Sequence, residues 1–198
     1  MTAVVLATHN PHKVREVQQI AAAARSDLTV LPYDGPEPVE DGVTFAQNAL
    51  IKARAALAHT GLPAVADDSG ICVDVLGGAP GVFSAYWAGH RKDAAANVAL
   101  LLDQLSDIAD PHRGAQFVST IALVTPDGAE HVVRGVWAGR LARERAGAGG
   151  FGYDPVFIPD EQPDARVRTV AEWSTQEKNA ASHRARAFQA LAPLLAAL

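Results

Sequence analysis

The chain has 198 residues, of which 48% are hydrophobic and 20% are charged, a balance that is typical of a folded globular protein. Its formal net charge of −5 lacks the basic excess expected of proteins that bind long nucleic acids, although a local group of cations could hold a small anion. The single cysteine, Cys72, excludes an intrachain disulfide, and no cysteine and histidine residues have the spacing of a zinc site.

The N-terminal residues form a short apolar run without a basic leader, so we expect no signal peptide. No stretch approaches the roughly 20 apolar residues that span a bilayer. We therefore predict a cytoplasmic protein whose partners include neither a membrane nor a nucleic acid. Because no polar linker is long enough to separate independent domains, residues 1–198 are expected to form a single domain with two lobes.

The first part of the chain shows a strand pattern followed by helix patterns. Residues 4–7 form a β-branched run typical of a buried strand. Residues 10–24 open on Asn-Pro and carry apolar side chains three and four positions apart, which predicts an amphipathic helix. The Pro-, Gly- and acid-rich residues 32–43 predict a loop, and a capping-box pattern then begins an alanine-rich helix over residues 44–59.

The middle of the chain predicts a second buried strand over residues 62–66. The sequence Asp-Asp-Ser-Gly at 67–70 ends this strand, unless residues 71–75 extend it. A glycine- and proline-rich turn follows, and residues 93–105 predict a third helix.

The last part of the chain predicts a hairpin and one long helix. Residues 116–124 and 131–139 flank Thr-Pro-Asp-Gly and predict two antiparallel strands. Residues 147–155 are too rich in glycine for regular structure, whereas residues 174–195 begin with a capping box and predict a continuous helix. The order of these elements predicts an α/β fold, with a central mixed β-sheet flanked by helices and two lobes around a groove.

The first candidate for chemistry is the segment Thr8-His9-Asn10-Pro11-His12-Lys13, between a strand and a helix. The free N–H groups and partial positive charge of a helix N-terminus suit phosphate. Lys13 adds a full charge, while Thr8 and Asn10 offer neutral hydrogen bonds. The alternative is ordinary helix capping beside a solvated lysine, and the glycines of a P-loop are absent.

The second candidate is the acidic pair Asp67 and Asp68, which follows an apolar strand. Ligands of α/β proteins bind at the carboxyl edge of the sheet, and carboxylate oxygens there could bind Mg²⁺ or take a proton from an attacking water. Glu40 and Asp41, in the acidic loop, are possible further ligands. The alternatives are simple turn chemistry for the pair and a solvated loop for the other two acids.

The third candidate is the glycine-rich segment around Phe151 and Asp154. Glycines let the backbone approach a ligand closely, an aromatic ring between them can stack on a planar base, and a carboxylate can orient the edge of the base. The alternative is an ordinary glycine loop with a core aromatic residue.

The fourth candidate comprises Lys178, Ser182, His183 and Arg184 on the predicted last helix. Lys178 and Ser182, four positions apart, are expected to share one face of that helix. One cation could then meet phosphate while its neighbours meet a base. The alternative is a solvated basic face.

Taken together, these segments resemble the inosine triphosphate pyrophosphatase, or Ham-type, family. The resembling stretches lie in the family's order along nearly the whole chain: LATHNPHKVRE, TFAQNALIKA, ADDSGICVDVLGGAPGVFSA, GGFGYDPVF and EKNAASHRARA. The resemblance implies a two-lobed α/β homodimer with a nucleotide between the lobes. It also implies Mg²⁺-dependent hydrolysis of the purine nucleotides ITP, dITP or XTP to the monophosphate and pyrophosphate.

The resemblance also assigns roles to single residues. Glu40 and Asp68 would hold Mg²⁺, Asp68 would activate water, Lys13 would assist catalysis, and Phe151 would stack on the purine. Substrate binding as a whole would fall to residues from both ends of the chain: Thr8, His9, Asn10, Lys13, Ser69, Phe151, Gly152, Tyr153, Asp154, Lys178, His183 and Arg184.

Base selection would need hydrogen-bond donors that face the 6-oxo group of inosine and xanthine, and His183 and Arg184 could supply them. An adenine amino group would leave these donors unpaired, which costs on the order of 1–3 kcal/mol each. Guanine also carries a 6-oxo group, so its exclusion must involve the 2-position, for which the sequence offers no candidate.

Two residues depart from the family pattern. His9 stands where many members have a small residue, and Tyr86 replaces a usual arginine, so this chain lacks any charge contact that the arginine makes. Two other functions remain open: a pyrophosphatase for other modified or canonical nucleotides, and a nucleotide-binding regulator that does not hydrolyse its ligand. The acidic pair argues against the regulator, since a pure binder has little need of it.

Overall fold

The computed structural model describes residues 2–9, 14, 17–18, 21–22 and 26–198. The chain forms two compact units. Unit 1 contains Met1–Asp68, Ser119–Gly135 and Arg186–Leu198, and unit 2 contains Ser69–Val118 and Val136–Ala185.

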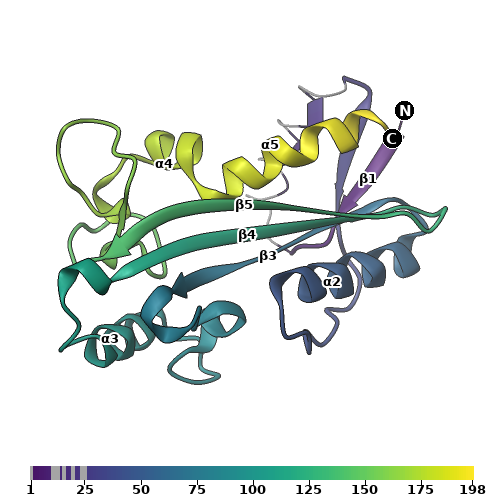
Figure 1. Ribbon diagram of the computed structural model, residues 1–198. Coiled ribbons are helices and arrows are strands. Elements are labelled where there is room, and N and C mark those ends of the chain that lie inside the picture. The colour runs from purple at the N-terminus through teal and green to yellow at the C-terminus, as the bar shows by residue number, and fades with distance from the viewer. Residues whose placement is uncertain (1, 10–13, 15–16, 19–20, 23–25) are drawn as a thin grey trace. The chain divides into compact units, whose positions relative to one another are not determined.

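The strands of the described residues form one sheet in the order β2-β1-β3-β4-β5-β6. Strand β1 pairs in parallel with β2 and β3, whereas β5 and β6 are antiparallel, so the sheet is mixed. This confirms the predicted α/β class with flanking helices (Figure 1). The strands are β1 Thr2–Leu6, β2 Leu28–Pro32, β3 Ala64–Val73, β4 Gly114–Val124, β5 Glu130–Leu141 and β6 Phe157–Pro159. The named α-helices are α2 Phe45–Thr60, α3 Ala94–Gln104, α4 Thr175–Ala181 and α5 His183–Ala196.

Unit 1 is a layered structure in which α2 and α5 cover opposite faces of the strands (Figure 1). Alternation along β1 explains this arrangement: Leu6 packs in one cluster with Phe188 of α5, while Val5 packs in another with Ala56 of α2. Three of the four buried residues of α2, Ala49, Ala53 and Ala56, are alanines, and these small side chains let the helix lie close to the sheet.

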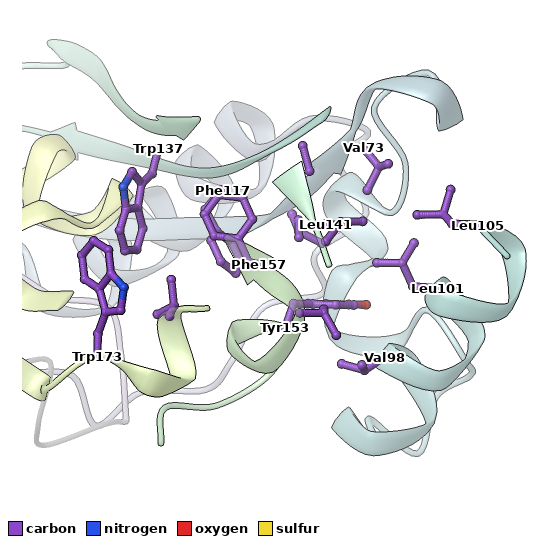
Figure 2. Packing of buried hydrophobic residues seen from close by; sticks show 14 residues of the cluster. Val73, Val98, Leu101, Leu105, Phe117, Trp137, Leu141, Tyr153, Phe157 and Trp173 are labelled. Carbon is purple, nitrogen blue, oxygen red and sulfur yellow. The ribbon is translucent and has the colours of Figure 1, made fainter. Parts of the chain in front are cut away.

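Unit 2 has a core of its own, which is rich in aromatic rings (Figure 2). Trp137 of β5 meets Phe157 of β6 and Trp173 edge to face, with ring centroids 5.8 and 5.2 Å apart. Apolar residues of α3, such as Leu101, complete the cluster. This core fixes the strand ends and loops that carry the candidate residues of unit 2.

Several predicted helix starts are confirmed in atomic detail. The Thr44 hydroxyl accepts a hydrogen bond from the backbone N–H of Gln47 at the start of α2, and the Asp93 carboxylate caps α3. Of the helix predicted over residues 10–24, residues 14, 17–18 and 21–22 are helical, while the proposed cap at Asn10 and Pro11 lies outside the described residues. Among the described helices, none combines the length and apolar character needed to cross a membrane.

Of the two alternatives left open for the acidic pair, an end of the strand and an extension past it, the structure confirms the extension. Strand β3 continues through Asp67, Asp68 and Gly70 to Val73, so these residues form no turn. The physical reason is the unequal length of the neighbouring strands. Strand β1 ends at Leu6, opposite Val65, whereas β3 runs on beside β4. The acids therefore lie beyond the carboxyl end of β1 but inside β3.

The prediction of one continuous C-terminal helix is wrong. Ser182 adopts an extended conformation (φ −64°, ψ 158°) and separates α4 from α5. Its hydroxyl accepts a hydrogen bond from the backbone N–H of Ala185 at 3.2 Å, so Ser182 caps the start of α5. The break cancels the prediction that Lys178 and Ser182 share a helix face, because the two residues are no longer in one uninterrupted helix.

Candidate active site

In unit 1, the side chain of Lys52 joins two carboxylates. The Lys52 ammonium lies 2.8 Å from Oε2 of Glu40 and 3.3 Å from Oδ1 of Asp68. The side chains of Lys52 and Asp68 are each only 17% exposed, so the pair is largely shielded from water. A shielded charge pair interacts more strongly than the same pair in bulk solvent.

Helix α2 and the strand geometry together build this group. Asn48 and Lys52 are four residues apart and therefore share one face of α2. Buried Asn48 hydrogen-bonds the Asp68 carboxylate and accepts from the backbone N–H of Gly42 at 2.9 Å. The second bond ties the acidic loop that carries Glu40 to the helix.

The charges in this group alter one another's protonation. Burial raises the pKa of Asp68 above its ordinary value, with Lys52 opposing the change and Glu40 adding to it. Burial alone would lower the pKa of Lys52, but the carboxylates of Asp68 and Glu40 outweigh it and raise the value. Lys52 is therefore a firmly protonated cation, and Asp68 is a better proton acceptor than an exposed aspartate.

Thr8 and His9 line one small cavity with Glu40 and Lys52, of about 50 Å³. The His9 ring stacks on Tyr33 with centroids 5.8 Å apart, and its Nδ1 lies 3.1 Å from Oε1 of Glu37. The unusual His9 is thus turned toward the acidic loop. The predicted site residues Asn10 and Lys13, and the neighbouring His12, lie outside the described residues.

The donor set around Lys52 suits Mg²⁺. Two carboxylates converge within 3.3 Å of one cationic nitrogen, and Mg²⁺ usually takes one or two protein carboxylates and fills its other positions with water and phosphate. In the described part of the chain, no group of three or more His, Cys, Asp or Glu side chains is arranged to hold a metal by itself. Asp41 is exposed and does not line the cavity.

In unit 2, a cavity of about 340 Å³ collects most of the remaining candidates. Ser69 and Gly70 of β3 line it together with the glycine loop and the start of the C-terminal helices. Eight residues that the resemblance assigns to substrate binding are among its lining residues: Ser69, Phe151, Gly152, Tyr153, Asp154, Lys178, His183 and Arg184. Ser182, a further candidate from the sequence, is not among them.

Asp154 is the anchor of this cavity and is only 2% exposed. Its Oδ2 accepts from the backbone N–H of Phe151 at 2.8 Å and from the ammonium of Lys178. The same ammonium lies 4.2 Å from the centroid of the Phe151 ring, which is 67% exposed in the cavity wall. Gly150, with φ +69°, is required because a Cβ there would lie 2.8 Å from Cγ of Asp154.

Two other predicted residues are held by the core. The Tyr153 hydroxyl donates to the carbonyl of Ser84 at 2.9 Å, and burial raises the pKa of this phenol above its ordinary range. The His183 ring stacks on Phe117 with centroids 4.9 Å apart. Both side chains therefore form fixed walls of the cavity.

Comparisons with known proteins agree with this picture. The sequence matches the Ham1 family over residues 4–194. The chain belongs to the Ham1 family. It is 60% identical to the dITP/XTP pyrophosphatase of Leifsonia xyli subsp. xyli, over 100% of this chain and 98% of that protein. It is 53% identical to the dITP/XTP pyrophosphatase of Streptomyces coelicolor, over 98% of each chain.

Solved structures give the same family. A HAM1 protein from Coxiella burnetii superposes with a TM-score of 0.90 at 40% identity and covers 100% of both chains. A nucleoside-triphosphatase, also named dITP/XTP pyrophosphatase, from Mycobacterium abscessus superposes with a TM-score of 0.82 at 49% identity, covering 97% of this chain and 100% of the other.

The structure of this Ham1 chain also adds residues that the sequence analysis missed. Lys52 and Asn48 were missed although their spacing of four in an alanine-rich helix places two polar groups on one buried face. Lys92 and Asn97 line the unit 2 cavity without any motif to mark them. Tyr86, in place of the family arginine, stacks on His90 with centroids 5.2 Å apart and does not line that cavity.

Proposed function

We propose that this Ham1 chain hydrolyses non-canonical purine nucleoside triphosphates, namely ITP, dITP and XTP, to the monophosphate and pyrophosphate. The observation that carries the proposal is the shielded Glu40–Lys52–Asp68 group, which combines a fixed cation with a proton acceptor. The names of the relatives, dITP/XTP pyrophosphatase, support the substrate class.

The chain's own residues supply the main requirements of the reaction. The oxygen of a water molecule attacks the α-phosphorus, the bond from that phosphorus to the oxygen bridging to the β-phosphorus breaks, and pyrophosphate leaves. Asp68 takes the proton that the water loses, while Lys52 offsets negative charge on the phosphates. Thr8 donates a neutral hydrogen bond to a phosphate oxygen, and Lys13 contributes a further charge.

Mg²⁺ is the proposed cofactor, and Glu40 and Asp68 would hold it. When bound, it neutralises phosphate charge and polarises the phosphorus–oxygen bonds. Because Lys52 already lies beside both carboxylates, it keeps their oxygens close together before any metal ion binds.

Base recognition is proposed for the unit 2 cavity. Phe151 offers an exposed ring for stacking, and Asp154 fixes the backbone that carries this ring. His183 and Arg184 supply donors to the 6-oxo group, while Ser69, Gly152 and Tyr153 shape the wall. An adenine base would leave these donors unpaired, at a cost of about 1–3 kcal/mol each.

We also propose a homodimer in the cytoplasm. The dimer is supported by the family resemblance, and the location by the presence of the nucleotide pool there. Light scattering after gel filtration tests the first proposal, and cell fractionation tests the second.

Pyrophosphate release from ITP, dITP, XTP, ATP and GTP, with and without Mg²⁺, tests the proposed activity. We expect faster turnover of the first three substrates and little release without metal. Asp68→Asn should lower kcat by at least about 100-fold and retain nucleotide binding. Asp103→Asn, which makes the same change at an exposed helix position, should have the same kcat and nucleotide binding as the parent. Equal rates on ATP and ITP would remove the specificity claim, and an active Asp68→Asn variant would remove the catalytic role.

A further inference from the structure

The unit 2 cavity contains a lysine for which neither the motifs nor the proposed function has a role. Lys92 lines the cavity together with Lys178, Ser69 and Asn97. Lys178 is already paired with buried Asp154. Within the described part of the chain, the Lys92 side chain makes no ion pair and no hydrogen bond. Lys92 thus brings to the cavity a positive charge that forms no ion pair with a carboxylate of the described chain.

The backbone holds Lys92 in an unusual conformation. It is the only non-glycine residue with positive φ among those described, at +54°. Its N–H donates to the carbonyl of Gly89 at 3.2 Å, and the next residue, Asp93, is the N-cap of α3. A left-handed lysine costs on the order of 1 kcal/mol or more, and such strain gathers at binding sites where the surrounding structure fixes it.

We propose that Lys92 binds the 2-oxo edge of xanthine and makes the site favour XTP over ITP. This inference rests on the proposed function, in which the unit 2 cavity takes the base. The residues proposed to act on the phosphates, Thr8, Glu40, Lys52 and Asp68, all belong to unit 1, whereas Lys92 lines the unit 2 cavity that is proposed for the base.

The chemistry of the three 6-oxopurines separates them at this edge. Xanthine carries an oxygen at position 2, and its neighbouring N3–H ionises near neutral pH, so the edge bears negative charge. Hypoxanthine has a C–H at position 2 in place of that oxygen, so an ammonium at this edge meets no negative charge and only the neutral acceptor N3. Guanine has an amino group, whose donors face the donors of Lys92 and leave both sets unpaired. One lysine thus favours xanthine and disfavours guanine, the discrimination that position 6 cannot provide.

The test compares kcat/KM for XTP, ITP and GTP in the parent and in Lys92→Met, which keeps the length of the side chain and the same backbone strain. We expect the XTP-to-ITP ratio to fall about tenfold, the size of one hydrogen bond to a charged group. Lys92→Arg should keep most of the ratio. Arg91→Met removes the same charge from the adjacent exposed position, which does not line the cavity, and should leave the ratio unchanged.

Calorimetry with the monophosphates XMP and IMP, without metal, provides a readout that does not need turnover. Lys92→Met should weaken binding of XMP about tenfold relative to IMP. An equal loss for both ligands would assign Lys92 to the sugar or phosphate and overturn the proposal, as would no loss for either. If the parent hydrolyses neither ITP nor XTP, the proposed function fails, and the XMP-to-IMP comparison still decides the role of Lys92.

Discussion

Asp154 offers the sharpest test of how the unit 2 cavity is held together. Its carboxylate is nearly fully buried and accepts from the Phe151 N–H and from Lys178. Asp154→Ala removes both bonds. It leaves the Lys178 ammonium without its partner and the backbone of the glycine loop without its anchor.

The magnitude follows from these two bonds. A hydrogen bond to a charged group contributes about 1.5–3 kcal/mol, and breaking a buried pair costs more when the remaining charge stays dry. The Lys178 side chain is 15% exposed, so its ammonium can turn toward water once released. The loss of its bond to Asp154 should therefore cost an amount near the lower end of that range. We expect a loss of about 3 kcal/mol, which lowers Tm by about 6–12 °C for a chain of this length.

Thermal unfolding followed by circular dichroism measures this loss, with Asp107→Ala as the matched control. Asp107 is exposed and makes no hydrogen bond or ion pair within the described chain, so its variant should stay within about 0.5 kcal/mol of the parent. Loss of XMP binding in Asp154→Ala but not in the control would link the anchor to the cavity.

A double-mutant cycle decides whether the pair acts as a unit. Lys178→Met alone leaves a buried carboxylate uncompensated, so it should also destabilise the protein. The double variant should lose about 1–2 kcal/mol less than the sum of the two single changes. Strict additivity would refute the reasoning, because it would mean that the contact between Asp154 and Lys178 contributes nothing.

Two further predictions concern the fold around the site. Ser182→Ala removes the cap of α5 and should lower the free energy of unfolding, measured in urea, by about 1 kcal/mol. Ser182→Thr keeps a hydroxyl and should retain most of that stability. An alanine variant as stable as the parent would show that the cap is unimportant. Gly70→Ala places a Cβ 2.6 Å from the Gly81 carbonyl, so this part of β3 must shift. We expect at least about tenfold weaker XMP binding by calorimetry, and unaltered binding would contradict the close approach.

The fold could be predicted where side-chain periodicity is strong and tertiary context agrees with it. Helices α2 and α3 begin at the capping residues that their sequences indicate. Strand β2 was missed although buried Leu28 and Val30 alternate with exposed Thr29, a usable signal in five residues. Strand β6 has only three residues, too few for any period, so its pairing with β5 depends on the surrounding core.

The candidate site was predicted unevenly for a related reason. The motifs identified Phe151 and Asp154, because glycines beside an aromatic residue and an acid form an unusual pattern. Lys52 was missed because a lysine on a helix normally lies on the solvated face. Only the depth of α2 against the sheet, set by its alanines, brings that ammonium between two carboxylates.

Both units contain a largely buried ion pair between an aspartate and a lysine. Each has a largely buried aspartate, Asp68 or Asp154, that meets a lysine from a helix, and each lysine side chain is only 15–17% exposed. Removing such charges from water costs nearly as much as their attraction returns, so ion pairs of this kind are poor sources of stability. Their value lies in position: each pair holds a charged side chain in place before any ligand arrives. A variant that replaced one pair with apolar residues of similar volume could therefore keep its fold, and its loss would appear in ligand binding or turnover.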